Sequence, residues 1–328
     1  MSKPKVFVTR AIPEKGLSVV QDFCNADIWP EELPPPREVV LERVKGVDGI
    51  LSLLTTKMDT AVMDAAGPQL KVISNYAVGF DNIDIPEATK RGIPVGNTPD
   101  VLTDTTADFA FTLLMAAARR VVEGDNYTRA GMWKTWGPKL LLGFDIHKAT
   151  LGLVGYGRIG KAMAKRASGF DMKVLYYDPS IKDDPADRAL NAHYADLDTL
   201  LKEADFVSIH TPLTDDTYHL ISTDALKKMK PTATLINTAR GPVVDNEALY
   251  HALKDGEIAY AALDVTEPEP IPMDSPLLKL DNIIIAPHIA SASRATRDKM
   301  AEMAAANLLA GLKGEPLPTC VNSELYNK

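Results

Sequence analysis

Cysteine is nearly absent from this sequence, with only Cys24 and Cys320 among its 328 residues. The two lie far apart and form no metal-spaced pair, so we expect neither a disulfide framework nor a metal site. Long apolar runs are lacking as well, because the longest, residues 109–118, is far below the about 20 residues needed to cross a bilayer. Residues 1–4 lead into an apolar stretch without signal-peptide features. We therefore expect a cytoplasmic protein with no membrane partner.

Positive charge is in the minority: 36 Lys and Arg stand against 44 Asp and Glu, a net charge of −8. No block of basic residues interrupts this balance. An acidic chain repels polyanions, so we expect neither nucleic acid nor an anionic membrane as the main partner. At about 150 residues per domain, the length predicts two domains with sizeable cores.

Short apolar runs alternate with amphipathic stretches of helical length. Runs rich in Val, Ile and Leu without strict alternation are typical of strands buried on both faces of a parallel sheet. The expected strands are residues 5–8, 27–29, 48–53, 70–74 and 93–96, and then 150–154, 173–177, 205–209, 233–236, 258–263 and 283–286. The pattern predicts an α/β fold with helix-covered, doubly wound parallel sheets.

Helix-start signals divide the strands into two sets. Thr105 and Asp108 have the spacing of a capping box ahead of a long helix that follows the first set of strands. Asp245 is an expected N-cap, and a second long helix is expected over residues 293–312. We place the domain junction near residue 99.

A glycine motif follows the expected strand 150–154. Gly155, Gly157 and Gly160 match Gly-x-Gly-x-x-Gly and open an amphipathic helical stretch. In this context the first glycine permits a tight turn, the second lets the backbone approach a pyrophosphate, and the third allows close helix–strand packing. The helix N-terminus offers N–H groups to the phosphates, and Arg158 is a candidate direct phosphate contact. The motif predicts a dinucleotide site.

Asp178 ends the next expected strand, eighteen residues after Gly160. An acidic residue at this distance accepts hydrogen bonds from the ribose hydroxyls and repels a 2′-phosphate. We therefore expect NAD as the cofactor, with NADH preferred over NADPH. Lys182 lies close enough in sequence to keep NADPH possible.

Polar residues follow the strands of the second set at their carboxyl ends. Ligands of doubly wound sheets bind beyond these ends. The polar residues at this edge are Asp178, His210, Asn237, Arg240, Asp264 and His288. We expect a functional site there.

Several motifs together resemble the NAD-dependent D-2-hydroxyacid dehydrogenase family. They are residues 155–160, 237–241, 262–265 with 269–270, and 287–289, and they occur in the order and at the spacing of the family. Residues 75–84 are most similar to the glyoxylate/hydroxypyruvate reductase branch. The resemblance implies two Rossmann-like domains: a doubly wound NAD-binding domain at 100–288, and a flavodoxin-like substrate domain at 1–99, to which 289–328 return.

The resemblance also implies the chemistry: hydride transfer from NADH to a small 2-oxo acid, glyoxylate or hydroxypyruvate. Arg240 would hold the substrate carboxylate, because its planar fork matches a carboxylate. His288 would protonate the carbonyl oxygen, and Glu269 would pair with its imidazole. The N–H groups of Val78 and Gly79 would cradle the carboxylate.

The remaining implied contacts concern the cofactor, the substrate and a second subunit. The cofactor-binding residues would be Thr106, Gly155, Gly157, Arg158, Ile159, Gly160, Asp178, His210, Thr211, Pro212, Thr217, Thr238, Ala239, Arg240, Asp264, His288 and Ala290. The substrate-binding residues would be Leu53, Tyr76, Val78, Gly79, Arg240 and His288. The resemblance implies a homodimer with residues 102–142 in its interface.

Several alternatives stay open on the sequence. Glu267 rivals Glu269, which we prefer because the family's glutamate stands five positions after Asp264. Trp136 either packs or reaches the partner subunit's substrate site. We expect the other histidines, His147, His193, His219 and His251, to be surface or structural residues. The rival functions are a D-lactate or other D-2-hydroxyacid dehydrogenase, and an NAD-sensing binding protein like the corepressors that share this fold.

Overall fold

The structure is a computed structural model that describes residues 2–182 and 185–326. It divides into two compact units, one formed by Met1–Leu102 with Ala292–Lys328 and the other by Thr103–Ser291. Both boundaries lie three residues after those expected from the sequence, at 99 and 288. No helix in these described ranges is both long and apolar enough to cross a membrane.

The first unit is built on a parallel sheet of five described strands in the order β2-β1-β3-β4-β5, which is the flavodoxin-like order. Its strands are β1 (Lys5–Val8), β2 (Asn25–Ile28), β3 (Gly49–Ser52), β4 (Val72–Asn75) and β5 (Val95–Gly96). Its helices are α1 (Glu14–Phe23), α2 (Arg37–Arg43), α3 (Thr60–Ala66), α4 (Ile85–Lys90) and α11 (Arg294–Lys313), with the 3-10 turn η4 (Ser323–Tyr326).

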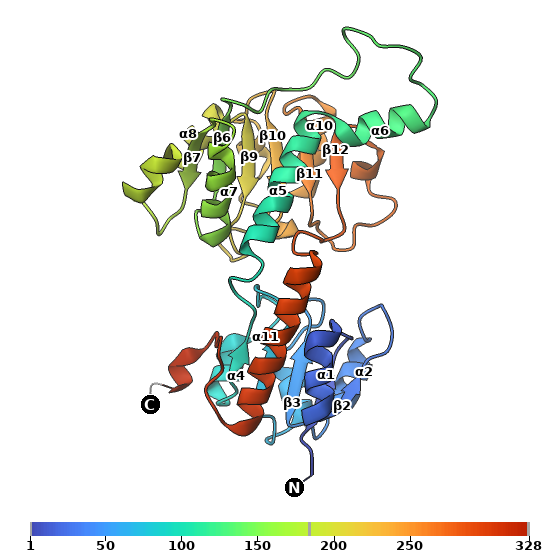
Figure 1. Ribbon diagram of the computed structural model, residues 1–328, viewed down its shortest axis with the longest axis vertical. Helices are drawn as coiled ribbons and strands as arrows, with labels where there is room; N and C mark the ends of the chain where they lie inside the picture. Colours follow the sequence, from blue (N-terminus) through green and yellow to red (C-terminus); the bar gives the residue numbers. More distant parts are fainter. Residues whose placement is uncertain (1, 183–184, 327–328) are drawn as a thin grey trace. The chain divides into compact units, whose positions relative to one another are not determined.

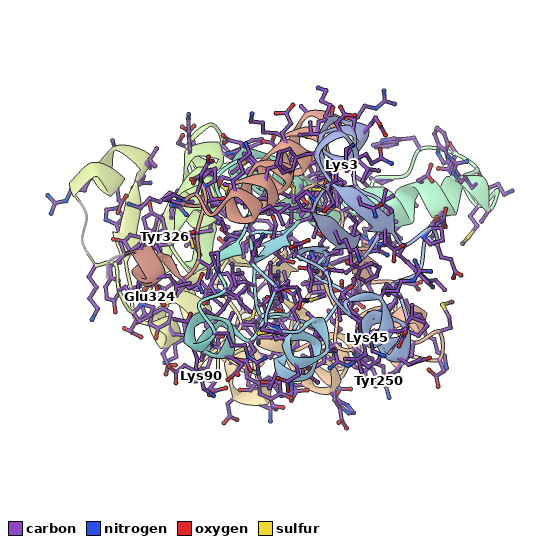
Figure 2. All side chains as sticks on the ribbon, turned by 90° about the horizontal axis from the view of Figure 1, so that it is seen from below. Lys3, Lys45, Lys90, Tyr250, Glu324 and Tyr326 are labelled. Atoms are coloured by element: carbon purple, nitrogen blue, oxygen red, sulfur yellow. The ribbon has the colours of Figure 1, made fainter. Side chains whose placement is uncertain are left out.

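The residues of this unit explain its layers. Apolar side chains of α2, α3 and α4, among them Val40, Val62 and Ala88, pack on one face of the sheet. Helix α11 packs against α1 and against strands β3 and β4, and Figure 1 shows it running beside α1. Exposed lysines such as Lys45 and Lys90 project outward from the ends of the covering helices (Figure 2).

The second unit has a parallel sheet of seven described strands in the order β12-β11-β10-β9-β6-β7-β8. The strands are β6 (Thr150–Val154), β7 (Lys173–Tyr177), β8 (Ala192–Tyr194), β9 (Phe206–Ile209), β10 (Thr234–Asn237), β11 (Tyr260–Leu263) and β12 (Ile283–Ile285). The helices are α5 (Thr103–Ala118), α6 (Val121–Arg129), α7 (Arg158–Ser168), α8 (Leu197–Glu203), α9 (Thr223–Leu226) and α10 (Asn246–Lys254), with the 3-10 turns η1 (Pro185–Leu190), η2 (Gly241–Val243) and η3 (Pro276–Lys279).

Two apolar layers sandwich this sheet, as expected for strands buried on both faces. Helices α5 and α7 contribute one layer, with residues such as Leu114 and Met163, and Figure 1 shows the two side by side. Helices α8, α9 and α10 contribute the other, with residues such as Leu200 and Leu249. The prediction of two parallel-sheet α/β domains is confirmed.

Strand register brings the carboxyl ends of the second sheet into one row. The paired residues across it are Tyr177, Val154, Ile209, Asn237, Leu263 and Ile285. The residue that follows each of these positions therefore lies at the same edge of the sheet. This alignment brings Asp178, Gly155, His210 and Asp264 to one edge although they are distant in sequence.

The predicted strands are present, each within about two residues at either end, but two details differ. Strand β8 was not predicted, because it is short and its middle residue, His193, is polar and exposed. The expected capping box at Thr105 is wrong, since α5 already begins at Thr103 and contains Thr105. The caps at Asp245 and Ser293 are formed by side chains that accept from Ala248 N and Thr296 N.

Candidate active site

The glycine loop between β6 and α7 fits closely against the neighbouring strand end. Gly155 has φ of +95°, and a Cβ there would lie 2.7 Å from the backbone C and O of His210. Only glycine tolerates both the left-handed backbone and this approach. A Cβ on Gly157, by contrast, would meet nothing within 4 Å, so that side of the loop is open. Helix α7 begins at Arg158, and its N-cap residue, Gly157, forms no side-chain cap; the start of such a helix suits an anion.

Asp178 lies against this loop. Its Oδ2 accepts a hydrogen bond from Tyr156 N at 2.9 Å, and its Oδ1 accepts from Ser180 N at 2.8 Å and Ile181 N at 3.2 Å. The three backbone donors hold the carboxylate at the end of β7, directly beside the glycine loop. This is the place that a ribose-binding carboxylate must occupy when the phosphates lie on α7.

Two threonines supply further polar groups to the same unit. Thr238 is 9% exposed, and its buried Oγ1 has no hydrogen-bond partner within the described residues. Buried hydroxyls normally have partners, so this one points to a ligand group. Thr106, on α5, is also buried. Together with the open glycine loop and Asp178, these residues fit a bound dinucleotide.

His210 follows β9 and is not suited to proton transfer at neutral pH. Its Nε2 lies 2.9 Å from Ser208 Oγ, and burial lowers the pKa of His210 to about 3. The imidazole is therefore neutral under ordinary conditions. The next residues turn tightly, because Thr217 Oγ1 donates to Pro212 O at 2.7 Å.

A turn after β10 fixes the backbone of Arg240. The side chain of Asn237 spans this turn: its Nδ2 donates to Arg240 O at 2.8 Å, and its Oδ1 accepts from Ala239 N at 3.0 Å. The Arg240 guanidinium is half-buried and donates from Nη1 to Ala239 O at 2.8 Å. Asn237 was part of the recognised motif but had no assigned role. The structure shows that it orders the turn carrying Arg240.

Glu269 and His288 form a hydrogen-bonded pair. Glu269 Oε1 lies 2.6 Å from His288 Nδ1, and the two side chains are 35% and 24% exposed. A contact at Nδ1 leaves Nε2 of the same ring as the second titratable position. The pair has the form of an acid–base group whose carboxylate orients the imidazole.

Asp264 holds the backbone on which His288 stands. Its two carboxylate oxygens accept from Ile289 N and Ala290 N at 2.7 Å each, and its carbonyl accepts from His288 N at 2.9 Å. His288 adopts φ of +53°, a conformation that these bonds stabilise. Burial raises the pKa of Asp264, against the two backbone donors and His288, which lower it. What the structure shows for Asp264 is thus a positioning role, and the contact with the cofactor stays a prediction.

The rival carboxylate has a different partner. Glu267 Oε2 lies 2.8 Å from His219 Nε2. Of the two glutamates in this loop, Glu269 is therefore the one that the structure pairs with His288. His219, which was expected to be a surface or structural residue, proves to be half of a second imidazole–carboxylate pair.

In the first unit, a turn after β4 carries Val78 and Gly79. Asn97 Nδ2 donates to Val78 O at 2.8 Å, and Asn75 Nδ2 donates to Gly79 O at 2.9 Å. Within the described residues, the N–H groups of Val78 and Gly79 donate no hydrogen bond. The turn thus has fixed carbonyls and two available donors, as an anion cradle needs. Asn75 belonged to the recognised motif 75–84 without an assigned role, and Asn97 was not singled out, since these side chains act only across the folded turn.

The other expected substrate residues, Leu53 and Tyr76, are both buried in this unit. Leu53 is 9% exposed and Tyr76 is 5% exposed. The Tyr76 hydroxyl donates to Arg297 O on α11 at 2.9 Å. Their contact with a substrate stays a prediction.

The fold and the site fit a dinucleotide-dependent α/β oxidoreductase, with an imidazole–carboxylate pair at the carboxyl edge of its second sheet. Residues 111–290 match the model of the D-isomer specific 2-hydroxyacid dehydrogenase NAD-binding domain. The protein belongs to the D-2-hydroxyacid dehydrogenase family and is an NAD(P)-dependent dehydrogenase. The resemblance noted on the sequence is thereby confirmed.

Relatives place the chain near one branch of the family. A glyoxylate reductase of Korarchaeum cryptofilum is 57% identical, over 98% of this chain and 97% of its own. A protein of Thermus thermophilus of known structure is 48% identical with a TM-score of 0.91, covering 97% and 99% of the two chains. The NADPH-dependent glyoxylate/hydroxypyruvate reductase of Sinorhizobium meliloti, solved with NADP and malonate, is 31% identical with a TM-score of 0.83, covering 98% of each chain.

Proposed function

We propose that this protein reduces glyoxylate or hydroxypyruvate to the 2-hydroxy acid with NADH. The observation that carries the proposal is the 2.6 Å contact between Glu269 and His288, in the same unit as a glycine loop that fits a dinucleotide. Relatives that share more than half of their residues with this chain are named glyoxylate reductases, which supports the substrate class.

The roles of the residues follow from their chemistry. When bound, NADH supplies the hydride to the carbonyl carbon. His288 gives a proton to the carbonyl oxygen, and Glu269 stabilises the imidazolium before that transfer and orients its ring. Arg240 binds the substrate carboxylate through its planar fork and polarises the 2-oxo group. In the first unit, the N–H groups of Val78 and Gly79 are the proposed donors to a substrate carboxylate. In the oxidative direction His288 acts as the base.

In this proposal, residues of the second unit hold the cofactor. Gly157 and the start of α7, with Arg158 and Ile159, would hold the phosphates. Asp178 accepts hydrogen bonds from the ribose hydroxyls, and this favours NADH because a 2′-phosphate would meet the carboxylate. The proposal extends to residues that line the dinucleotide further along, namely Thr106, His210, Thr211, Pro212, Thr217, Thr238, Ala239, Asp264 and Ala290.

A homodimer in the cytoplasm completes the proposal. Helix α6 and the segment after it expose large apolar side chains, including Val121 at 57%, Trp136 at 79% and Leu142 at 65%. Figure 1 shows this segment as a long excursion from α6. Several large apolar side chains exposed to this extent in one segment are typical of an interaction surface. A second copy of the chain would cover it, and sedimentation at increasing protein concentration tests that assembly.

One panel of assays tests the function. Initial rates with glyoxylate, hydroxypyruvate, pyruvate and bulkier 2-oxo acids are measured with NADH and with NADPH. We expect the highest kcat/KM for glyoxylate or hydroxypyruvate with NADH. A higher kcat/KM for pyruvate or a bulkier acid would refute the proposed substrate, and a preference for NADPH would refute the proposed cofactor. Rates at background for every acid would favour an NAD-sensing protein.

A further inference from the structure

The acid loop, defined as residues 266–270, carries two glutamates that each contact a different histidine. Glu269 contacts His288 at 2.6 Å, whereas Glu267 contacts His219 at 2.8 Å. The side chains of Glu267 and His219 are half-buried, at 30% and 31% exposure. His219 stands in the segment that follows β9, so this pair joins the acid loop to another part of the sheet edge.

His219 is itself held on several sides. The ring of Tyr218 stacks on the imidazole with centroids 4.0 Å apart. Asp245 Oδ2 lies 3.9 Å from His219 Nδ1, while Oδ1 of the same carboxylate caps α10 by accepting from Ala248 N. The backbone N–H of His219 donates to Pro242 O at 2.8 Å. The imidazole therefore has a carboxylate on each side and a fixed backbone.

The acid loop lacks packing on one side. A cavity of about 470 Å³ opens beside Glu267 and Pro268, and Tyr250, labelled in Figure 2, is among its other lining residues. On another side the loop touches Gly241, where a Cβ would lie 1.9 Å from Thr266 O. Because apolar packing does not hold the loop from the cavity side, its position depends on backbone contact and on polar contacts. Asn246 Nδ2 donates to Glu267 O, and the Glu267 side chain contacts His219.

Glu267 is rigidly linked to Glu269. Pro268 stands between them and Pro270 follows, and each proline ring fixes its own φ. A loop with two of its five residues so restricted moves largely as one piece. Anchoring Glu267 therefore anchors the backbone from which the Glu269 side chain extends toward His288.

We infer that His219 and Glu267 are positioning residues of the reaction: their contact holds the acid loop and keeps Glu269 against His288. This inference rests on the proposed function, because it assigns no contact with substrate to either residue. It adds a second imidazole–carboxylate pair whose role is geometric, next to the pair that moves the proton.

The test is the pH dependence of glyoxylate reduction in His219→Asn and Glu267→Ala; asparagine is used at 219 because its φ of +49° is one that asparagine tolerates. Reduction needs a protonated His288, and a well-placed Glu269 carboxylate stabilises that form. If the loop loses its tie, the basic limb of the kcat profile moves to lower pH by about half a unit or more, and kcat falls ~10-fold. The KM for NADH changes less than about twofold, because the residues proposed to bind the dinucleotide are unchanged.

Three variants make the test specific. Glu267→Gln keeps an acceptor for the imidazole. It should show most of the wild-type kcat, with the basic limb of the kcat profile at the wild-type pH. His193→Ala removes an exposed histidine of β8, and Asp22→Ala removes an exposed carboxylate of α1; both should match the wild type. The double variant His219→Asn with Glu267→Ala should lose no more than either single variant, because both changes break the same contact.

Two outcomes would overturn the inference. One is a wild-type basic limb with kcat within about twofold in both single variants, His219→Asn and Glu267→Ala. The other is an additive loss in the double variant. Glu269→Gln separates this failure from that of the proposed function: if it moves the basic limb while the two single variants do not, only the positioning inference fails. If Glu269→Gln leaves rate and limb unchanged, the acid–base assignment fails, and the inference with it. Circular dichroism of every variant identifies one that does not fold, and the other single variant then carries the test.

Discussion

The imidazole of His288 and the carboxylate of Glu269 are in direct contact, with Nδ1 and Oε1 2.6 Å apart, although nineteen residues separate them in sequence. The contact depends on two supports. Asp264 fixes the backbone after His288 by accepting from Ile289 N and Ala290 N, and the acid loop brings Glu269 from the other side. Such geometry suits a proton donor whose ring must keep one orientation.

Replacing His288 tests the proton transfer. We expect His288→Asn to lower kcat for glyoxylate reduction by ~10²–10⁴-fold, the usual scale for a lost general acid. Asparagine is chosen because residue 288 has φ of +53°, which asparagine tolerates. His251→Asn, at an exposed position of α10, is the control. Near-normal turnover in His288→Asn would contradict the assignment.

Replacing Arg240 tests carboxylate binding. Arg240→Lys should lower kcat/KM for glyoxylate by ~10²-fold or more, because an ammonium group does not reproduce the planar two-point contact of the guanidinium. The measurement is steady-state kinetics with saturating NADH. Added guanidinium should partly restore the rate of Arg240→Ala. A lysine variant as active as the wild type would remove Arg240 from the site.

Asp178 is expected to set the cofactor preference. In Asp178→Asn the ratio of kcat/KM for NADPH to that for NADH should rise ~10-fold or more, equivalent to about 1.4 kcal/mol, because the charge that repels a 2′-phosphate is gone. The one amide oxygen replaces only one of the two accepting carboxylate oxygens, which face Tyr156 N and Ser180 N with Ile181 N, so circular dichroism first checks that the variant folds. Asp171→Asn, at an exposed position before β7, serves as control. An unchanged ratio would argue that another group selects the cofactor.

Gly241 should tolerate no side chain. A Cβ there would lie 1.9 Å from Thr266 O and 2.1 Å from Thr266 C, so the acid loop must move away from the turn that carries Arg240. We expect Gly241→Ala to lose at least ~10²-fold in kcat/KM, because displacement of two catalytic elements spoils alignment. Gly169→Ala adds a methyl only 3.4 Å from Arg166 O, an ordinary contact, and should remain active. Equal activity of the two variants would show that the close approach is unimportant.

The hydrogen bond of Tyr260 leads us to expect that the protein becomes less stable at alkaline pH. Its hydroxyl donates to Glu123 Oε2 at 2.5 Å, and burial, with Glu123 beside it, raises the pKa of Tyr260 from 10.0 to about 12. The folded state therefore keeps a proton that the unfolded chain loses first, so stability falls as pH rises through this window. Tyr260→Phe should cost about 1–3 kcal/mol at neutral pH, the value of a hydrogen bond to a charged group.

The pH dependence distinguishes this bond from a packing effect. The difference in unfolding free energy between wild type and Tyr260→Phe, measured by denaturant titration, should be constant below about pH 10 and shrink as the pH rises through about 12. A difference that stays constant across that range would show that the hydroxyl contributes no proton-linked stability.

Much of the fold could be predicted from the sequence because the signals are local. Runs such as 150–154 and 233–236 identify buried strands by composition alone, and Asp245 identifies a helix start through its side chain. Strand β8 was not predicted because its three residues bury too little apolar surface to form a recognisable apolar run. The start of α5 was misplaced by three residues, because Thr105 as N-cap would start the helix at Thr106 and α5 starts at Thr103. Helix ends depend on the chain that precedes them as well as on the capping pattern.

The sequence alone determined the glycine loop, the acidic residue after the next strand, and the presence of an arginine and a histidine after later strands, because each follows from a short pattern with its own physical reason. Glu269 was preferred over Glu267 only through the resemblance to the family, and the tertiary structure shows which histidine each of the two glutamates contacts. The two carboxylates are chemically identical and two positions apart, so their partners depend on the path of the folded loop between His219 and His288. The same holds for Asn237, Asn75 and Asn97, whose amides order their turns through contacts that exist only once the chain has folded.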